Sequence, residues 1–515
     1  MKNIYALLVA IVLFATSCKK SFIELAPQDQ ISGATFFQTE TQFRQALAAA
    51  YVPLRNLTND DYLLNEMRSD NTYYENYSVN RGAGYVYREN IADFTDDAGN
   101  TLTADEYYSC YDGIARCNNI LDQINAAAVS DSAKNDIGGQ AEFLRAFNYF
   151  KLVRCFGGVP LFVKRVKVAE DAFLPRSTVD EVYDRIMADA QDAVNKLLPP
   201  DRFPQGGLAT KGAATMLLAD VYLTRKRYAE AEALLKTLPA MGYGLNANYA
   251  DAFSVTNKNS KESIFEVQYH EGLTGGQQSN FIYVFLPRSS NTTIITGVKT
   301  DNTGTGGYNI PTQDLIDSYE PNDSRLDASI AVAEGTYNAS MFFTFTANKS
   351  ILNYVPAAGK VGVPYAKKYL HAHSNPNNTN DDWPVYRYAE ALLALAEALN
   401  EQGKSGEALP YLNQVRDRAF GAGVSPVTTT DQASLRTIIL HERRVELAFE
   451  NKRWPDLVRT GNAINVMTAF GNALKQTLSY VPATAFAIDN NKLLYPIPQP
   501  EIAINPKLVQ NPGYF

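Results

Sequence analysis

Residues that build metal, redox and covalent catalytic centres are scarce in this sequence, which contains 4 Cys and 4 His. Cys110 and Cys117 fall about 10 Å apart on a predicted helix, beyond the roughly 7 Å that a disulfide allows between Cα atoms. Cys155 could meet one of them only after folding, so we predict three buried free thiols. No cysteine spacing matches a zinc or redox motif. Nucleophile elbows, phosphate-binding glycine loops and dinucleotide-binding fingerprints are also absent, and we predict no cofactor.

Long apolar runs and basic stripes are missing as well. After the first residues, no apolar stretch approaches the roughly 20 residues that cross a bilayer, so we expect a water-soluble mature chain. The net charge is -8, and the lack of a basic stripe argues against nucleic acid as a partner. Tryptophan is rare, at 2 residues against 31 Tyr. We place Trp383 and Trp454 in the scaffold, so an aromatic binding surface would be built from Tyr.

The N-terminus has the layout of an export signal. Residues 7–14 are apolar, and three small residues precede Cys18. This pattern predicts a signal peptide at 1–17. The cysteine at the cleavage point resembles a lipobox, in which Cys18 is acylated, although Ala15 stands where Leu is commonest. Ordinary secretory cleavage is the alternative. Residues 18–35 follow as an extended tether, and lipid alone would hold the chain to a membrane.

Helical periodicity dominates the first part of the mature chain, residues 36–254. An apolar content of 45% and a charged content of 20% are ordinary for a globular protein with a sizeable core. Glycines and prolines follow the third and fourth predicted helices and mark their ends. Apolar residues recur at helical spacing in 41–57, 106–128, 132–156 and 179–198.

Two segments far apart in the chain share one pattern. Large and small apolar residues fall at spacings 0, +1, +4, +13 and +17 in 209–239 and again in 386–419, starting from Leu218 and Leu395. This spacing is typical of tetratricopeptide helix pairs, in which small residues let two antiparallel helices approach closely. We therefore predict a mainly α fold on a tetratricopeptide-like scaffold, with C-terminal helix pairs and a tail over 384–515.

A loop-rich insert at 255–383 separates the two copies. Residues 264–269 alternate like a strand, and many Gly, Asn, Thr and Ser residues surround them. The segment is too long for a linker. Long loops on a rigid scaffold commonly carry binding sites, so we expect short strands and part of a ligand site here.

Six segments, in this order along the chain, resemble the SusD/RagB outer-membrane lipoproteins of Bacteroidetes. None is decisive alone, but together they extend the resemblance over essentially the full length. They are Ser69-Asp70-Asn71, 111–121, 142–161, 412–419, 442–457 and 494–514.

The resemblance implies a fold, a partner and a location. Members of the family form mostly helical single units, here 36–515, with tetratricopeptide pairs as the scaffold and loops that carry the ligand site. They cap a SusC-like TonB-dependent transporter, capture oligosaccharides for import and have no catalytic activity. The resemblance therefore implies a lipid-anchored outer-membrane protein that faces the cell exterior and is not an enzyme. Lys19 and Lys20 follow Cys18 where the clearest surface-export signals are acidic, so outward exposure rests on the family.

The segment 70–97 is predicted to be an aromatic loop with the composition of a sugar site. Sugars need flat aromatic rings for their C–H faces and polar groups for their hydroxyls, and this segment interleaves Tyr with Asn and Arg. Neither helical nor strand periodicity gathers its aromatics on one buried face. About half of its tyrosines are still expected to pack against the helices. Our candidate ligand-binding residues are Asp70, Asn71, Tyr73, Tyr74, Tyr77 and Arg81, and from the insert Tyr283, Tyr308 and Asn309.

Specific residues and segments could suggest other functions. Glu442, Glu446 and Glu450 lie on one helical stripe and could suggest a glycoside hydrolase, but we interpret them as part of a structural salt-bridge network. The candidate cations are the nearby Arg443, Arg444 and Arg453, with Arg145 or Arg416 as partners from other helices. The second alternative is a tetratricopeptide adaptor that binds only protein, and a non-glycan nutrient could also replace the sugar. His371 and His373 could project to one side, but without a third ligand we predict no metal.

Overall fold

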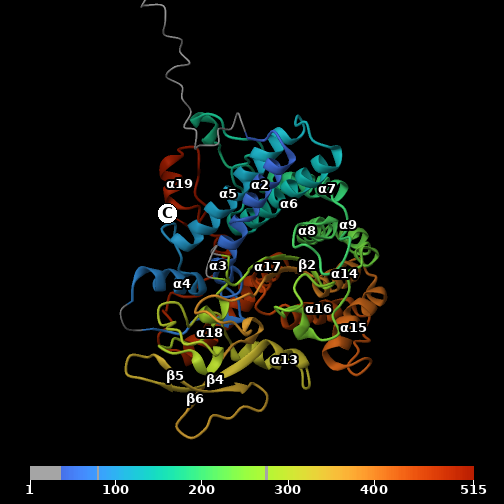
Figure 1. Cartoon of the computed structure of the whole chain (residues 1–515). Helices are drawn as coiled ribbons and strands as arrows, with labels where there is room; N and C mark the ends of the chain where they lie inside the picture. Colours follow the sequence, from blue (N-terminus) through green and yellow to red (C-terminus); the bar gives the residue numbers. More distant parts are fainter. Residues whose placement is uncertain (1–35, 78–80, 273–276, 515) are drawn as a thin grey trace, which may run out of the picture.

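The structure is a computed structural model that describes residues 36–77, 81–272 and 277–514. Helix accounts for 50% of the chain and strand for 8%, which confirms the mainly α fold. Strands β4, β5 and β6 gather at the lower edge of Figure 1, below the helical scaffold. The predicted signal peptide, Cys18 and the tether lie outside the described residues. Within the described ranges, no helix is both long and apolar enough to cross a membrane.

Capping residues and helix breakers set the helix ends in the first part of the chain. Thr178 and Glu181 form a reciprocal capping box at the start of one helix, and Gly157, with φ 73°, ends another as predicted. The helices are α2 (Glu40–Tyr51), α3 (Pro53–Asn65), α4 (Ala83–Asp93), α5 (Thr101–Ile124), α6 (Asp131–Phe156), α7 (Val179–Lys196), α8 (Lys211–Thr224) and α9 (Tyr228–Leu235).

Two expectations for this part were wrong. The single helix predicted over 41–57 is two helices, α2 and α3, because Pro53 lacks an N–H and starts a new helix after Val52. The segment 70–97 is also not a loop throughout, because it contains helix α4. This helix begins just after Gly82, and its C-terminal capping residue is Phe94, which adopts a left-handed conformation with φ 61°.

The two predicted helix pairs are confirmed, and they lie side by side. The second pair and the remaining C-terminal helices are α14 (Tyr388–Glu401), α15 (Ser405–Phe420), α16 (Gln432–Glu446), α17 (Arg453–Arg459), α18 (Ala463–Thr477) and α19 (Gln499–Ile504). Helix α9 of the first pair packs against α14 of the second. The repeat alanines Ala219, Ala231, Ala396 and Ala408 are all buried at these close approaches. Copies that are distant in sequence therefore stack as neighbouring repeats.

Three small sheets contain strands of the insert, and two of them pair the insert with neighbouring segments. The predicted strand at 264–269 is β2 (Ser263–Val267), which pairs antiparallel with β7 (Trp383–Arg387). In a second sheet β4 (Ile330–Tyr337) lies between β5 (Phe343–Ser350) and β6 (Val361–Ala366). β1 (Thr72–Tyr73) pairs with β3 (Ile310–Pro311). Four short helices complete the insert: α10 (Phe281–Phe285), α11 (Thr293–Thr296), α12 (Gln313–Asp317) and α13 (Ser324–Ser329).

One large hydrophobic core runs through the helical scaffold, and a small second core lies beneath the β4–β6 sheet. Trp383 and Trp454 are buried in the large core, as predicted for scaffold residues. Cys110, Cys117 and Cys155 are buried free thiols, which confirms that prediction. The scaffold is therefore closed by packing rather than by disulfides among the described cysteines.

Candidate ligand-binding cavity

A cavity of about 430 Å³ opens where the segment after β1 meets the insert. This volume falls within the range of small-molecule sites. Side chains from four parts of the chain line it: Tyr74, Glu75, Asn76, Ile310, Tyr337, Met341, Val363 and Tyr480. We call it the tyrosine cavity.

The β1–β3 pair fixes one wall of the tyrosine cavity. Tyr73 pairs with Ile310 across the ladder, and the Glu75 N–H donates to the Gly307 carbonyl at 2.7 Å. Gly307 has φ 84°, and a Cβ there would lie 2.9 Å from the Glu75 carboxylate. A glycine is required for this close approach. The predicted aromatic segment and the insert thus form one continuous surface.

Tyrosine rings provide the flat faces of the cavity. Tyr337 and Tyr480 are half-buried, and the Tyr480 ring lies 5.9 Å from that of Tyr74, centroid to centroid. Tyr74 itself is buried, and its hydroxyl donates to Asp93 at 2.9 Å. The Tyr73 hydroxyl donates to the same carboxylate. Burial raises the pKa of Asp93 to about 6, although both tyrosine hydrogen bonds oppose the shift.

Glu75 is the one ionisable carboxylate among the residues that line the tyrosine cavity. One of its oxygens accepts a hydrogen bond from the Tyr337 hydroxyl, and the other accepts one from the backbone N–H of Arg288 at 3.2 Å. Burial raises the pKa of Glu75 above its ordinary value. Lys and Arg are absent from the described lining, so the cavity offers aromatic faces, an amide and a carboxylate without a cation.

Asp70 and Asn71 lie outside the cavity and join the first helices to the C-terminal ones. Asp70 forms ion pairs with Arg453 at 2.7 Å and Arg444 at 3.0 Å. The Asn71 amide donates to Glu66 at 2.8 Å, and its oxygen accepts from Arg444 at 2.8 Å. Burial raises the pKa of Glu66 to about 7. Asp70 and Asn71 are therefore buried polar residues whose hydrogen bonds and ion pairs hold the C-terminal helices to the first helices.

Tyr77 and Arg81 also contact protein partners. Tyr77 is buried and stacks on Phe342 with 5.2 Å between centroids, and the guanidinium of Arg288 lies 4.7 Å from the Tyr77 ring. Arg81 forms an ion pair with Glu89 of α4. Tyr77 therefore packs the aromatic segment against the insert, whereas Arg81 pairs within the segment.

The candidates from the insert are fully buried. The Tyr283 hydroxyl lies 2.6 Å from Nε2 of His373, and Tyr308 accepts from Arg288 at 3.2 Å. The Asn309 side chain is buried without a hydrogen-bond partner among the described residues. Of the nine predicted contact residues, Tyr74 alone lines the tyrosine cavity, and the ligand role of all nine stays a prediction.

Tyr337, Tyr480 and Glu75 were missed at the sequence level. Glu75 lies within the predicted segment, but the composition of that segment points to amides and arginine as the polar ligand contacts. Tyr337 ends a strand and Tyr480 follows α18, so neither carries a local signal of a site. Only the folded chain brings them to Tyr74.

The predicted glutamate network is confirmed, with a different set of cations. Glu442 pairs with Arg325 at 2.6 Å and with the predicted Arg416 at 2.7 Å. Arg145 was the wrong partner, because it pairs with Asp189 instead. We call the whole set the buried ion-pair cluster: Glu262, Glu442, Glu446, Glu450, Arg325, Arg387, Arg416, Arg418 and Lys368.

Neighbouring arginines keep Glu446 and Glu450 ionised. Arg418, Arg387 and Arg325 lower the pKa of Glu446 to about 2 against the opposing effect of burial. The pKa of Glu450 is also lowered, chiefly by Arg387. A general acid for glycoside hydrolysis needs a raised pKa and access to substrate, and Glu446 and Glu450 have neither.

Both histidines of the His-Ala-His pair are hydrogen-bonded to protein groups. Nδ1 of His371 lies 2.5 Å from Asp381, and Nδ1 of His373 lies 2.8 Å from the His371 carbonyl. The described residues contain no group of three or more potential metal ligands.

Comparison with known families covers most of the chain. Residues 261–514 match the model of the SusD family, and residues 21–223 match a model described as starch-binding associating with outer membrane. The chain belongs to the SusD/RagB family.

Relatives and solved structures agree with this assignment. SusD-like protein P2 of Formosa agariphila is 28% identical over 98% of this chain and 98% of its own length. Starch-binding protein SusD of Bacteroides thetaiotaomicron is 23% identical, over 78% of this chain and 76% of its own. Surface glycan-binding protein A from Bacteroides fluxus superposes with a TM-score of 0.74 at 26% identity, covering 92% of this chain and 100% of the other. A SusD-like protein from Bacteroides fragilis gives 0.73 at 25% identity, over 95% and 100%.

Proposed function

We propose that this protein binds an uncharged oligosaccharide in the tyrosine cavity and delivers it to a SusC-like TonB-dependent transporter. In this proposal, lipid on Cys18 anchors the chain in the outer membrane with the cavity exposed to the cell exterior. Binding is non-covalent and no reaction is catalysed. The observation that carries the proposal is the half-buried pair Tyr337 and Tyr480, which lines the cavity beside Glu75 and Asn76.

A sugar suits this arrangement of groups. The rings of Tyr337 and Tyr480 offer apolar faces for C–H groups, while the Glu75 carboxylate and the Asn76 amide can bond hydroxyls. The walls are held from behind by the β1–β3 ladder and by the hydrogen bonds to Asp93. Such a preformed site loses little conformational entropy on binding. Family relatives named as starch-binding and glycan-binding proteins support the same ligand class.

The charge of the lining favours uncharged sugars. A uronate or sulfate group would sit beside Glu75 without a lining cation to pair with, and an unpaired charge in a partly buried site is costly. A neutral hydroxyl can instead donate to the carboxylate.

The test is affinity electrophoresis of the mature chain carrying Cys18→Ser, against neutral and acidic polysaccharides. We expect retardation by at least one neutral glycan, lost in Tyr337→Ala/Tyr480→Ala. Tyr411→Ala, which removes a half-buried tyrosine of α15 away from the cavity, is the matched control and should retain binding. Retardation that survives the double substitution would move the site. Absence of retardation by every glycan would favour a non-glycan nutrient or a purely protein-binding adaptor.

A further inference from the structure

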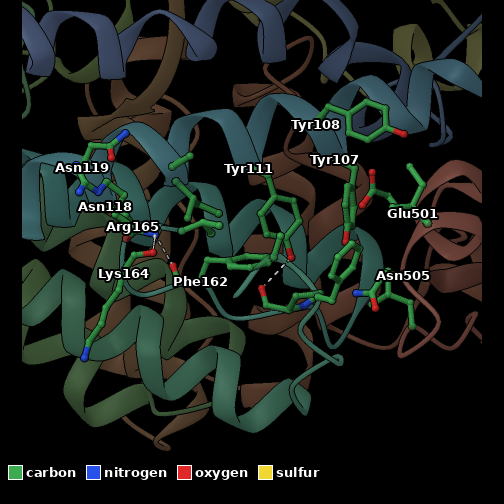
Figure 2. A pocket seen from close by; sticks show the side chains of 18 residues that line it. Tyr107, Tyr108, Tyr111, Asn118, Asn119, Phe162, Lys164, Arg165, Glu501 and Asn505 are labelled. Carbon is green, nitrogen blue, oxygen red and sulfur yellow. Dashed lines mark hydrogen bonds between the residues drawn. The ribbon is translucent and has the colours of Figure 1, made fainter. Parts of the chain in front are cut away.

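A second and larger cavity, of about 550 Å³, lies between α5, the segment 160–173 and α19 (Figure 2). In Figure 1, α5 and α19 lie well away from the β4–β6 sheet that borders the tyrosine cavity. The proposed function does not use this second cavity, which we call the α5 groove.

Aromatic rings form the floor of the α5 groove. Tyr107 and Tyr111 lie 4.7 Å apart, centroid to centroid, and Phe162 lies 5.7 Å from Tyr111. The Tyr111 hydroxyl donates to a backbone carbonyl at 2.8 Å, so its ring orientation is fixed. Tyr108 is 39% exposed at one edge, and Ile504 is 64% exposed nearby. Exposed apolar groups around a groove are typical of a surface that another segment covers.

The two ends of the groove carry opposite charges. Glu501 lies at the Tyr107–Tyr108 end, and Lys164 and Arg165 lie at the other end, beyond Phe162 (Figure 2). Glu501 forms no ion pair within the described part of the chain. A segment complementary to the groove would be basic at the Glu501 end, apolar over the aromatic floor, and acidic at the end with Lys164 and Arg165.

We propose that residues 19–25 of this chain bind in the α5 groove. They read Lys-Lys-Ser-Phe-Ile-Glu-Leu, which is this order of charge and hydrophobicity. Lys19 and Lys20 pair with Glu501, Phe22 and Ile23 cover the aromatic floor, and Glu24 pairs with Lys164 or Arg165.

The path of the chain agrees with this direction. Arg116 near the middle of α5 donates to the carbonyl of Ala49 at the end of α2, whereas Arg44 nearer the start of α2 pairs with Asp136, early in α6. Because α6 follows the C-terminal end of α5, the start of α2 lies toward that end. This is the end of α5 that carries Asn119, beside Lys164 and Arg165.

The length of the intervening chain is sufficient. Residues 25–36 can extend over about 36–40 Å, and α5, with 24 residues, is about 36 Å long. A tethered segment has an effective concentration of about 1 mM, so weak intrinsic affinity is enough to keep it bound. The docking does not need the lipid. If Cys18 is acylated, as the proposed function holds, the bound segment would turn the α5–α19 face toward the membrane.

Disulfide trapping tests the proposal in the mature chain carrying Cys18→Ser. Ser21→Cys is combined with Ala115→Cys, an exposed position in the middle of the groove, or with Ala433→Cys, an exposed control on α16. The native thiols are buried and do not compete. Under mild oxidation we expect the Ala115 pair to cross-link in most molecules and at least fivefold more than the Ala433 pair. Equal yields would overturn the proposal.

Charge reversal makes the test specific. Glu501→Lys should lower the yield of the Ala115 pair severalfold, and adding Lys19→Glu and Lys20→Glu should restore it. If the cross-linking yield does not change with Glu501→Lys or with the added lysine substitutions, the segment does not occupy the groove in this orientation. Suppression of the cross-link by an oligosaccharide, with no response to charge reversal, would instead assign the groove to sugar.

Discussion

The buried ion-pair cluster and the tyrosine cavity both place glutamates among tyrosines, yet they differ in solvent access and charge balance. In the cluster, Glu446 is fully buried and contacts three arginines, which lower its pKa to about 2. In the cavity, Glu75 is half-buried, and burial raises its pKa, although the nearby Arg288, which is not part of the lining, opposes this shift. A paired and sealed carboxylate stabilises the fold, whereas a carboxylate at an open aromatic cavity can bind a ligand.

The largest expected effect comes from opening the cluster. Arg387 is 2% exposed and pairs with Glu262, Glu446 and Glu450. Arg387→Met leaves their charges short of a partner, so the free energy of unfolding in urea should fall by about 3–5 kcal/mol. Arg227→Ala removes an exposed pair with Glu230 and should cost less than about 1 kcal/mol. Equal losses in the two variants would contradict a structural role for the cluster.

The pH dependence of stability should separate the two carboxylates by sign. The folded pKa of Glu446 lies below the unfolded value of about 4.3, so its contribution is present above pH 4.5 and is lost as pH falls toward 2. The raised pKa of Glu75 acts in the opposite sense, since stability falls as pH rises above about 4.3.

Urea unfolding between pH 2 and 7 measures both slopes. Glu446→Gln should flatten the loss at low pH, and Glu75→Gln should reduce, without abolishing, the slope above pH 4.3, because Asp93 and Glu66 also have raised pKa values. A wild-type acid slope in Glu446→Gln would show that the arginines do not hold this carboxylate ionised.

Replacing one cavity ring should affect binding without affecting stability much. Tyr480 is half-buried and its hydroxyl makes only a long 3.4 Å bond to the Tyr74 carbonyl. Tyr480→Ala should weaken glycan binding about tenfold, or about 1.4 kcal/mol, whereas Tyr480→Phe retains the ring and should stay within about twofold. Isothermal titration calorimetry distinguishes them. Equal losses in both would mean that the hydroxyl, not the stacking face, binds the sugar.

The smallest effect concerns ligand charge. Glu75→Gln keeps the shape of the side chain and removes its charge, so affinity for a neutral glycan should change by less than about threefold. Binding of an acidic glycan should become detectable or increase, because the repulsion beside the cavity is gone. An acidic glycan that already binds the wild-type chain more tightly than neutral ones would contradict the ligand class proposed for the cavity.

Local sequence patterns predicted the scaffold better than the site. The paired helices α8–α9 and α14–α15 and strand β2 followed from periodicity, and the burial of Trp383 and Trp454 followed from their neighbours. These features depend on contacts between residues close in sequence or on a repeated spacing.

The site depends on contacts that no local pattern records. Tyr73 and Tyr77 looked available for ligand, but pairing of β1 with β3 and packing on Phe342 bury them. Tyr337 and Tyr480 meet Tyr74 from distant parts of the chain. The same limit applied to the cluster, where Arg325 and Arg387 were not predicted as partners. Composition pointed to a segment that contributes to the lining of a cavity, but it could not decide which rings face solvent.

A crystal structure of the protein with the neutral oligosaccharide that binds most tightly would test the central claim most directly. We predict sugar rings stacked on Tyr337 and Tyr480, with hydroxyls within hydrogen-bond distance of Glu75 and Asn76. Sugar bound elsewhere, with the tyrosine cavity occupied only by water, would contradict the assignment of this cavity as the ligand site.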